Sequence, residues 1–329
     1  MRALVVHEFG PVHSHRVEDV PSPTIAEKDV LIEVHAIGLN FPDTLMLQGK
    51  YQTRPDRPFI PGRDAAGVVR AIGPEVTRVK IGDRVMAQVP TGAFAEQMSA
   101  HESRCFVIPQ SLDFVTAAGM LTNYHAAYVA AVIRGQLSHG ETVLITGASG
   151  GVGLAAVQIA KAKGARVLAG VSSAEKGKIV KANGADHLID LSVSDLHENL
   201  RQQVFALTSN RGVEAVIELV GGAVFHAALR AVAYCGRMII AGFVTGDIPQ
   251  IKAHHVLLKN ISVIGAPIDI RFKMEPKTVD ATYSELIRMF ENRQIKPQVM
   301  ATFPLDQIHR AIDVIVERKV TGKVVLTTR

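Results

Sequence analysis

The first hundred residues consist of short apolar runs separated by turn residues, and this pattern predicts β-strands. Glycine and proline punctuate the runs, as in Gly73-Pro74 and Gly82-Asp83. Strands are expected over residues 3–6, 30–39, 67–72, 84–89 and 94–99. Many short strands with frequent turns are typical of a barrel-like β domain.

From residue 114 the pattern changes, and continuous apolar runs alternate with longer helical stretches. The first of these stretches predicts a helix over residues 117–133. Strands are then expected over residues 142–146, 166–171, 187–189, 213–219, 237–241 and 261–264, and helices over residues 152–163, 174–183, 195–208 and 223–232. This alternation predicts a parallel sheet covered on both faces, and about six strands fit a doubly wound Rossmann fold.

The last part of the chain predicts two helices, over residues 279–292 and 305–318, followed by a strand over residues 323–327. We expect this final strand to return to the first domain. The predicted fold class is therefore α/β, with a β-barrel domain and a doubly wound parallel-sheet domain.

The composition is that of an ordinary globular protein. The 329 residues are 47% hydrophobic and 20% charged, and this length suits two domains. The net charge of +5 comes without a run of five or more basic residues, which suits a phosphate-bearing cofactor. We do not expect nucleic acid as a partner, although scattered basic charge leaves weak, non-specific affinity open.

Cysteine usage and the N-terminal sequence indicate the compartment. Cys105 and Cys235 form no paired spacing, which favours a reducing environment. The apolar stretch at residues 3–6 is broken by His7 and Glu8, and no segment reaches the roughly 18 apolar residues that a membrane helix needs. We therefore expect a cytoplasmic protein that does not bind a membrane.

A glycine-rich loop with the sequence TGASGGVG spans residues 146–153, between an expected strand and an expected helix. Gly150 and Gly153 occupy the second and third glycine positions of the dinucleotide-binding fingerprint, and Ala148 fills the first. The residues expected to hold the cofactor's phosphates are Ser149, Gly150, Gly151, Val152 and Gly153. The alternative is a plain glycine-rich turn.

The end of the second Rossmann strand favours NADPH over NADH. Enzymes that prefer NAD usually carry an acid there, about 20 residues past the loop. This chain has Ser172, Ser173 and Lys176, which could bond a 2′-phosphate, although Glu175 lies among them. Alternatively, Ser173 only caps a helix and Lys176 is a solvated surface charge.

Several short motifs together resemble the zinc-independent quinone oxidoreductases related to ζ-crystallin, in the medium-chain dehydrogenase/reductase superfamily. In the first domain they are GLNFPD (residues 38–43), GKY (49–51), PGRDAAG (61–67) and GDRV (82–85). In the rest of the chain they are LT (121–122), the loop at 147–153, VGG (220–222), AGF (241–243) and TGKVV (321–325). The order and spacing of these motifs carry the resemblance, which spans essentially the whole chain.

The resemblance implies a GroES-like catalytic domain of residues 1–117 and 266–329 and an NADP-binding Rossmann domain of residues 118–265. It places the active site in a cleft, a common location for ligands. It also implies a homodimer in which the strand over residues 261–264 extends the sheet across subunits.

The resemblance assigns catalytic roles to Tyr51 and Asn40. Tyr51 matches a tyrosine proposed as a proton donor in related enoyl-thioester reductases, and the alternative is a tyrosine that only packs. Asn40 is expected to form a hydrogen bond with the nicotinamide amide or the acceptor oxygen. The alternative is that it has only a structural role in a turn.

The resemblance also implies further contacts to the cofactor. Thr122 and Phe243 should border the nicotinamide, Val220 should contact the cofactor, and Lys323 should reach its phosphates. Asp43 is expected to fix the loop that carries Asn40. Arg63 departs from the family pattern, and either pairs with a nearby acid or binds an anionic substrate group.

No metal is expected. The positions that match the catalytic zinc ligands of related alcohol dehydrogenases are Asn40 and Arg63, and neither side chain type is a credible zinc ligand. Among the histidines, only His125 is singled out, as a candidate substrate contact.

Without a metal, a conjugated acceptor suits the chemistry better than a simple ketone, because the charge that arrives with a hydride spreads to a distant oxygen. The predicted function is therefore NADPH-dependent reduction of quinones or α,β-unsaturated carbonyl compounds. The alternatives are an enoyl-thioester (enoyl-CoA) reductase and a non-catalytic protein that binds NADPH or RNA, as in crystallin relatives.

Overall fold

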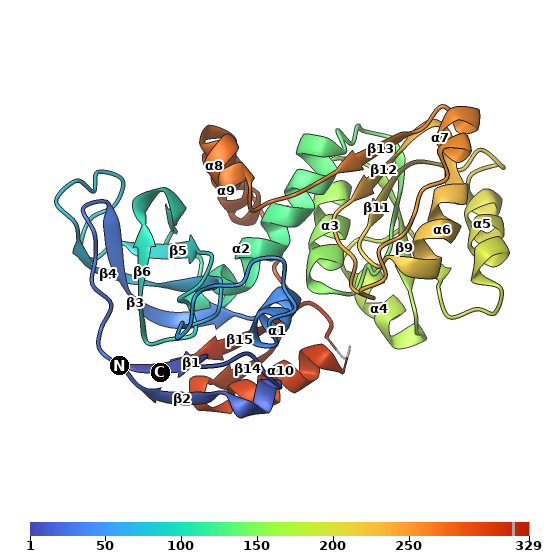
Figure 1. Cartoon of the computed structure of the whole chain (residues 1–329). Coiled ribbons are helices and arrows are strands. Elements are labelled where there is room, and N and C mark those ends of the chain that lie inside the picture. Colours follow the sequence, from blue (N-terminus) through green and yellow to red (C-terminus); the bar gives the residue numbers. More distant parts are fainter. Residues whose placement is uncertain (318–319, 329) are drawn as a thin grey trace. The chain divides into compact units, whose positions relative to one another are not determined.

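The computed structural model describes residues 1–317 and 320–328. Within these residues it divides into two compact units, which we describe separately (Figure 1). The first unit combines residues 1–122 with residues 297–329, and the second unit consists of residues 123–296.

A seven-stranded sheet forms the body of the first unit, in the order β14-β15-β3-β4-β5-β7 with β6 paired to β3. Its strands are β3 (Asp29–Gly38), β4 (Asp64–Ile72), β5 (Arg84–Gln88), β6 (Gln97–His101), β7 (Cys105–Val107), β14 (Val299–Pro304) and β15 (Lys323–Thr327). β1 (Arg2–Val5) and β2 (Arg16–Asp19) form a separate pair. The helices of this unit include α1 (Phe41–Leu47) and α10 (Ile308–Val316).

The last strand, β15, pairs antiparallel with β3, and Val325 lies opposite Gly38. The predicted return of the chain's final strand to the first domain is thus confirmed. The helix expected over residues 305–318 is a 3₁₀ turn (Leu305–Gln307) followed by α10, and Arg318 lies outside the described residues.

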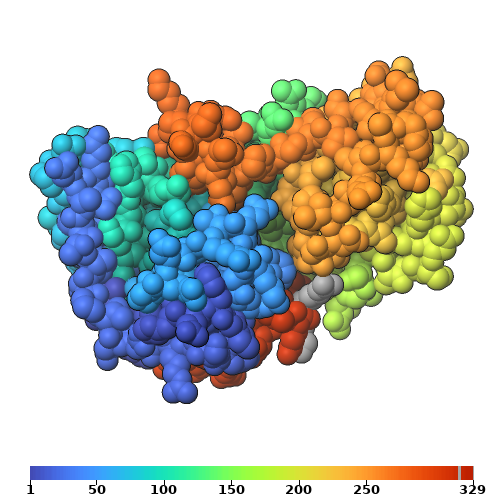
Figure 2. Space-filling view, viewed as in Figure 1, coloured from blue at the N-terminus to red at the C-terminus, as the bar shows by residue number. Residues whose placement is uncertain are grey.

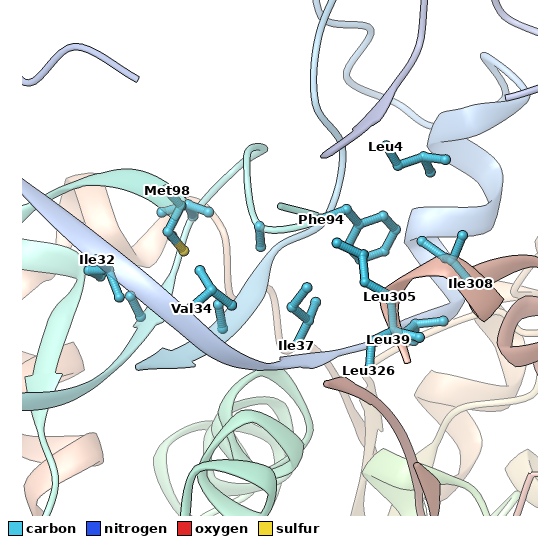
Figure 3. Packing of buried hydrophobic residues seen from close by; sticks show 14 of the residues in the cluster. Leu4, Ile32, Val34, Ile37, Leu39, Phe94, Met98, Leu305, Ile308 and Leu326 are labelled. Carbon is cyan, nitrogen blue, oxygen red and sulfur yellow. The ribbon is translucent and has the colours of Figure 1, made fainter. Parts of the chain in front are cut away.

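The core of the first unit lies on one side of β3, where alternate residues point inward. Figure 3 shows Ile32, Val34 and Ile37 among side chains from other elements. These neighbours are Leu4, Leu39, Phe94, Met98, Leu305, Ile308 and Leu326. Full burial of an aliphatic side chain contributes about 1.5–3 kcal/mol, so contacts between both chain ends stabilise this unit.

The second unit contains a six-stranded sheet in the order β10-β9-β8-β11-β12-β13, and all neighbouring strands are parallel. The strands are β8 (Thr142–Ile145), β9 (Arg166–Val171), β10 (His187–Asp190), β11 (Val213–Glu218), β12 (Val232–Ile240) and β13 (Ser262–Gly265). The connecting helices are α3 (Gly151–Ala162), α4 (Ala174–Ala182), α5 (Leu196–Leu207), α6 (Gly222–Ala231) and α7 (Ala253–Lys259). This confirms the predicted doubly wound sheet.

The strand order reverses direction between β8 and β11, and this fixes which helices share a face. Because parallel crossovers are right-handed, α3 and α4 cover one face of the sheet, while α5, α6 and α7 cover the other. The reversal also marks the edge where ligands bind in such sheets.

Residues 266–296 lie in the second unit, whereas the sequence had placed them in the first. They contain α8 (Arg271–Met274) and α9 (Pro276–Glu291). Tyr283 of α9 is fully buried, with its Oη 3.4 Å from His125 Nδ1, and Lys296 N donates to Gln158 Oε1 at 2.8 Å. The boundary therefore differs because an amphipathic helix shows that it must pack, but not which unit it packs against.

The other boundary falls inside a helix. α2 (Phe114–Tyr128) crosses the division between Thr122 and Asn123, and continues as a π-helical turn (Val129–Arg134). The sequence had placed this division at residues 117/118. Within residues 1–317 and 320–328, no helix combines the length and apolar character that a membrane span requires.

Candidate functional site

Three buried polar residues and one half-buried residue meet at the carboxyl end of β3 in the first unit. Gly38, the last residue of β3, lies opposite Asp64 of β4 on one side and Val325 of β15 on the other. A Cβ atom on Gly38 would lie 2.2 Å from Ala118 O, so only glycine fits there. This register gathers what we call the polar cluster, formed by Asn40, Asp64, Thr122 and Lys323.

Asp64 is the central acceptor of the polar cluster and is fully buried. Its Oδ1 accepts a hydrogen bond from Thr122 Oγ1 at 2.7 Å, and its Oδ2 accepts from Asn40 Nδ2 at 3.0 Å. Lys323 Nζ lies 3.2 Å from the same Oδ2. One cation and neutral donors thus offset the cost of burying this charge.

Asn40 and Lys323 are bonded to each other inside the polar cluster. Asn40 Oδ1 accepts from Lys323 Nζ at 2.6 Å, while Asn40 Nδ2 donates to Asp64 and, at 3.3 Å, to Gly38 O. The structure therefore brings Asn40, Thr122 and Lys323 together. Their expected contacts with the cofactor or the acceptor stay predictions.

Asp43 fixes the start of α1, as predicted. Its Oδ2 accepts from Asn40 N at 2.7 Å, which holds the backbone that carries the Asn40 side chain. The other oxygen, Oδ1, is buried and finds no hydrogen-bond partner among residues 1–317 and 320–328. Burial, reinforced by the nearby charge of Asp64, raises the pKa of Asp43 to about 7.

Tyr51 and Arg63 form a pair in the first unit. Arg63 is buried, and its Nη1 donates to Tyr51 Oη at 3.2 Å. Of the two roles considered for Arg63, neither anticipated this bond to a phenol. The bond places a cationic, planar guanidinium beside the phenol of Tyr51.

The glycine-rich loop of the second unit leads into the start of α3. Gly150 is the residue before α3 and no side chain caps the helix, so its first N–H groups remain for a ligand. A Cβ on Gly153 would lie 2.2 Å from Gly147 O, whereas a Cβ on Gly150 would meet nothing closer than 3.5 Å. Gly153 is therefore required for packing, and Gly150 leaves open space.

A buried acid next to this loop was not identified from the sequence. Glu218, at the end of β11, is fully buried and accepts from Thr146 Oγ1 at 3.1 Å and from the N–H groups of Val220 and Gly221, each at 3.0 Å. Burial raises the pKa of Glu218 above its ordinary value, and the hydrogen bonds from these backbone N–H groups offset only part of that rise. The sequence did contain a signal for this residue, because an acidic side chain stands at the end of a mostly apolar strand, next to the turn that follows it.

The proposed 2′-phosphate residues lie together at the end of β9. Ser173 caps α4, because its Oγ accepts from Lys176 N at 3.3 Å, and Lys176 Nζ lies 3.5 Å from Ser172 Oγ. The capping alternative is thus present, and it leaves the hydroxyl of Ser172 and the ammonium of Lys176 as the phosphate candidates.

In the same unit, Val220 lies close to the glycine-rich loop, and Phe243 lies close to Gly221, the residue that follows Val220. A Cβ on Gly147 would be 3.0 Å from Val220 Cγ2, and one on Gly221 would be 3.4 Å from Phe243 Cδ1. The structure therefore brings the glycine-rich loop, Val220 and the Phe243 loop to one edge of the sheet.

Two domain families match the chain. The family described as the alcohol dehydrogenase GroES-like domain matches residues 26–137, and the family described as zinc-binding dehydrogenase matches residues 151–282. A quinone oxidoreductase-like protein 2 homolog of Nematostella vectensis is 36% identical over 332 residues, which cover 100% of this chain and 89% of that protein. The chain belongs to the quinone oxidoreductase family.

Solved structures agree with this family and with the superfamily of medium-chain dehydrogenases/reductases. A mycobacterial protein complexed with NADPH has a TM-score of 0.92 and 31% identity, covering 99% of this chain and 100% of that one. The Escherichia coli quinone oxidoreductase complexed with NADPH has a TM-score of 0.89 and 26% identity, with coverage of 99% and 100%. The predicted family and the predicted GroES-like and Rossmann folds are confirmed.

One matched family is described as zinc-binding, which raises the question of whether the residues of this chain could hold a metal ion. Among the described residues, no three His, Cys, Asp or Glu side chains are gathered so that they could hold a metal ion. Asn40 is hydrogen-bonded to Asp64 and Lys323, and Arg63 is hydrogen-bonded to Tyr51. His125 is fully buried and packs edge-on against Phe272 in the second unit.

Proposed function

We propose that this family member reduces quinones or α,β-unsaturated carbonyl compounds with NADPH and without a metal. One observation carries the proposal: Arg63, at a position where zinc relatives hold a ligand, instead donates a hydrogen bond to the phenol of Tyr51. A fixed cation and an acid are thus available where a metal would otherwise activate the acceptor.

The residues of the glycine-rich loop fit NADPH. The uncapped start of α3 and the open space at Gly150 suit the pyrophosphate, and Ser172 with Lys176 suits the 2′-phosphate. The NADPH complexes of two similar proteins support this cofactor. When bound, NADPH supplies a hydride.

Tyr51 is the proposed proton donor. When the conjugated acceptor is reduced, negative charge would build up on its carbonyl oxygen, and Tyr51 Oη would donate its proton to that oxygen. The guanidinium of Arg63 stabilises the phenolate that remains. A proton taken up from the solvent would restore the phenol, so that the reaction consumes one hydride and one proton.

The test follows consumption of NADPH with 1,4-benzoquinone, an enone such as 1-octen-3-one, and crotonyl-CoA, each with and without a chelator. We expect turnover of quinone and enone that the chelator leaves unchanged. Tyr51→Phe should lower kcat for the enone by about 10²- to 10⁴-fold and spare the quinone, whose reduction needs less specific proton delivery. Loss of all activity on chelation, or turnover of crotonyl-CoA alone, would overturn the proposal.

A matched pair of glycine variants separates cofactor binding from folding. Gly150→Ala should fold normally, because its Cβ has room, and lose NADPH affinity because the pyrophosphate needs that space. Gly153→Ala should instead destabilise the second unit, since its Cβ would meet Gly147 O. Normal NADPH binding by folded Gly150→Ala would remove the loop from the proposal.

The homodimer is also a proposal. β13 is an edge strand of its sheet, and the adjacent helix α7 exposes 78% of Leu257 and 75% of Leu258. An open edge beside exposed leucines suits pairing with a second copy.

Both cysteines are free thiols, which supports the proposed reducing, cytoplasmic compartment.

A further inference from the structure

A pocket in the second unit is lined mainly by basic side chains and is not part of the glycine-rich loop. Its volume is about 370 Å³, within the range of small-molecule pockets. It lies between α5, α6 and the segment that leads into α7. The lining residues are His197, His226, Leu229, Arg230, Gln250, Lys252 and His255, and we call this the basic pocket.

The basic pocket is on the face of the sheet that α5, α6 and α7 cover, opposite α3 and α4. In Figure 1 these three helices lie together on one side of the second unit, and Figure 2 shows the orange segment with α7 at the surface beside yellow α5. The pocket is therefore open to solvent and separate from the helix start at Gly150.

The charges around the basic pocket are not balanced. None of its lining residues is acidic. The carboxylate of Glu198, next to the lining residue His197, is shared by Arg201, at 2.6 Å, and by Arg230, at 3.4 Å. Lys252 also lines the pocket, and Lys259 Nζ donates to the carbonyl oxygen of the lining residue Arg230.

Two titratable groups respond to this excess of positive charge. Burial lowers the pKa of His255, and so do His254, Lys252, Arg230 and Lys259. Burial likewise lowers the pKa of Lys259, with further lowering by Arg201 and Arg230. Both directions agree with a positive potential at the pocket.

The donors of the basic pocket suit a phosphate group. Arg230 presents a planar guanidinium and bonds His197 Nδ1 at 2.7 Å, which holds both side chains in place. Lys252, His226, His255 and Gln250 offer further N–H donors around the same space. A phosphate has several acceptor oxygens and up to two negative charges, and so uses more of these donors than a carboxylate does.

We propose that the basic pocket is a second ligand site, which binds a small phosphate-bearing molecule while the glycine-rich loop holds its own ligand. This site does not depend on the catalytic proposal. With it, the second unit would have two anion sites, one at the edge of the sheet before α3 and the other on the face covered by α5, α6 and α7.

The test uses inorganic pyrophosphate as the probe and isothermal titration calorimetry of the full chain at low salt, with and without saturating NADPH. We expect one pyrophosphate per chain in both conditions, with weaker binding of citrate. Lys252→Gln and Arg230→Gln should each weaken binding about tenfold, the effect of losing a charge-assisted hydrogen bond. His226→Ala alters an exposed side chain and should weaken binding without affecting the fold.

Lys80→Gln is the matched control, because it removes one exposed lysine of the first unit and should leave pyrophosphate affinity within twofold. The proposal is wrong if wild type binds no pyrophosphate, if NADPH displaces it, or if all variants bind equally. Equal affinity for citrate would also overturn it. So would a clear preference for a short single-stranded RNA that depends on Lys252, since the pocket would then serve a nucleic acid.

Discussion

The two units each bury an acidic side chain completely, but they compensate its charge in different ways. Asp64 of the first unit lies against the ammonium of Lys323, which comes from the far end of the chain. Glu218 of the second unit accepts hydrogen bonds from Thr146 and from two backbone N–H groups of the turn that follows it. An ion pair therefore ties distant strands together in one unit, and backbone dipoles fix a local turn in the other.

Asp43 is a third buried acid, and its surroundings differ from those of Asp64 and Glu218. It accepts one backbone N–H, and no hydrogen-bond partner of its Oδ1 is found in the described part of the chain. Burial raises its pKa to about 7, so protonation takes the place of a partner. Three buried acids thus differ in how much the surrounding donors offset desolvation, and each difference can be measured.

The largest effect is expected when the cation is removed from Asp64. Lys323→Met leaves a buried carboxylate without its counter-charge and should lower the free energy of unfolding by about 3–5 kcal/mol. Denaturant unfolding of the variant and the wild type measures this. The double variant Asp64→Asn/Lys323→Met removes both charges and should recover much of the loss. A single variant as stable as wild type would show that neutral donors alone compensate Asp64.

A smaller effect is expected at Glu218. Glu218→Gln replaces one acceptor oxygen by an NH₂ group that must face backbone N–H donors, and should cost about 1–3 kcal/mol of unfolding free energy. Glu75→Gln, at an exposed site, should change stability by less than about 0.5 kcal/mol. If both variants behave alike in denaturant unfolding, the backbone donors do not stabilise Glu218.

The smallest effect is a change with pH at Asp43. The folded pKa is about 7 and the unfolded pKa lies near its ordinary value of about 4, so between these values the folded chain keeps a proton that the unfolded chain loses. Stability must therefore fall as pH rises across this window and become constant above it.

Asp43→Asn removes this proton but keeps an acceptor for Asn40 N. Relative to wild type, the variant should gain about 1 kcal/mol of unfolding free energy when the pH rises from 6 to 7. Denaturant unfolding at several pH values measures the gain. A difference that stays constant with pH would mean that Asp43 is ionised in the folded chain.

Much of the second unit could be predicted from sequence, because its signals are local. A continuous apolar run, a glycine-rich loop and a helix follow one another at residues 142–163, and β9 (Arg166–Val171) lies at its predicted residues. Because the loop lies between a strand and a helix, the sequence also predicted that it holds the phosphates of a dinucleotide cofactor. Residues 266–296 were placed in the wrong unit because helix amphipathicity does not identify the packing partner.

The sequence by itself determined the two folds, the family and the glycine-rich loop, since strand alternation, helix period and glycine positions act within a few residues. The tertiary structure alone decided the partners of the buried polar groups. Asn40, Asp64 and Lys323 meet because Gly38 pairs with β4 on one side and β15 on the other. Strand register sets such meetings, and a shift of one residue would turn these side chains to the opposite face of the sheet.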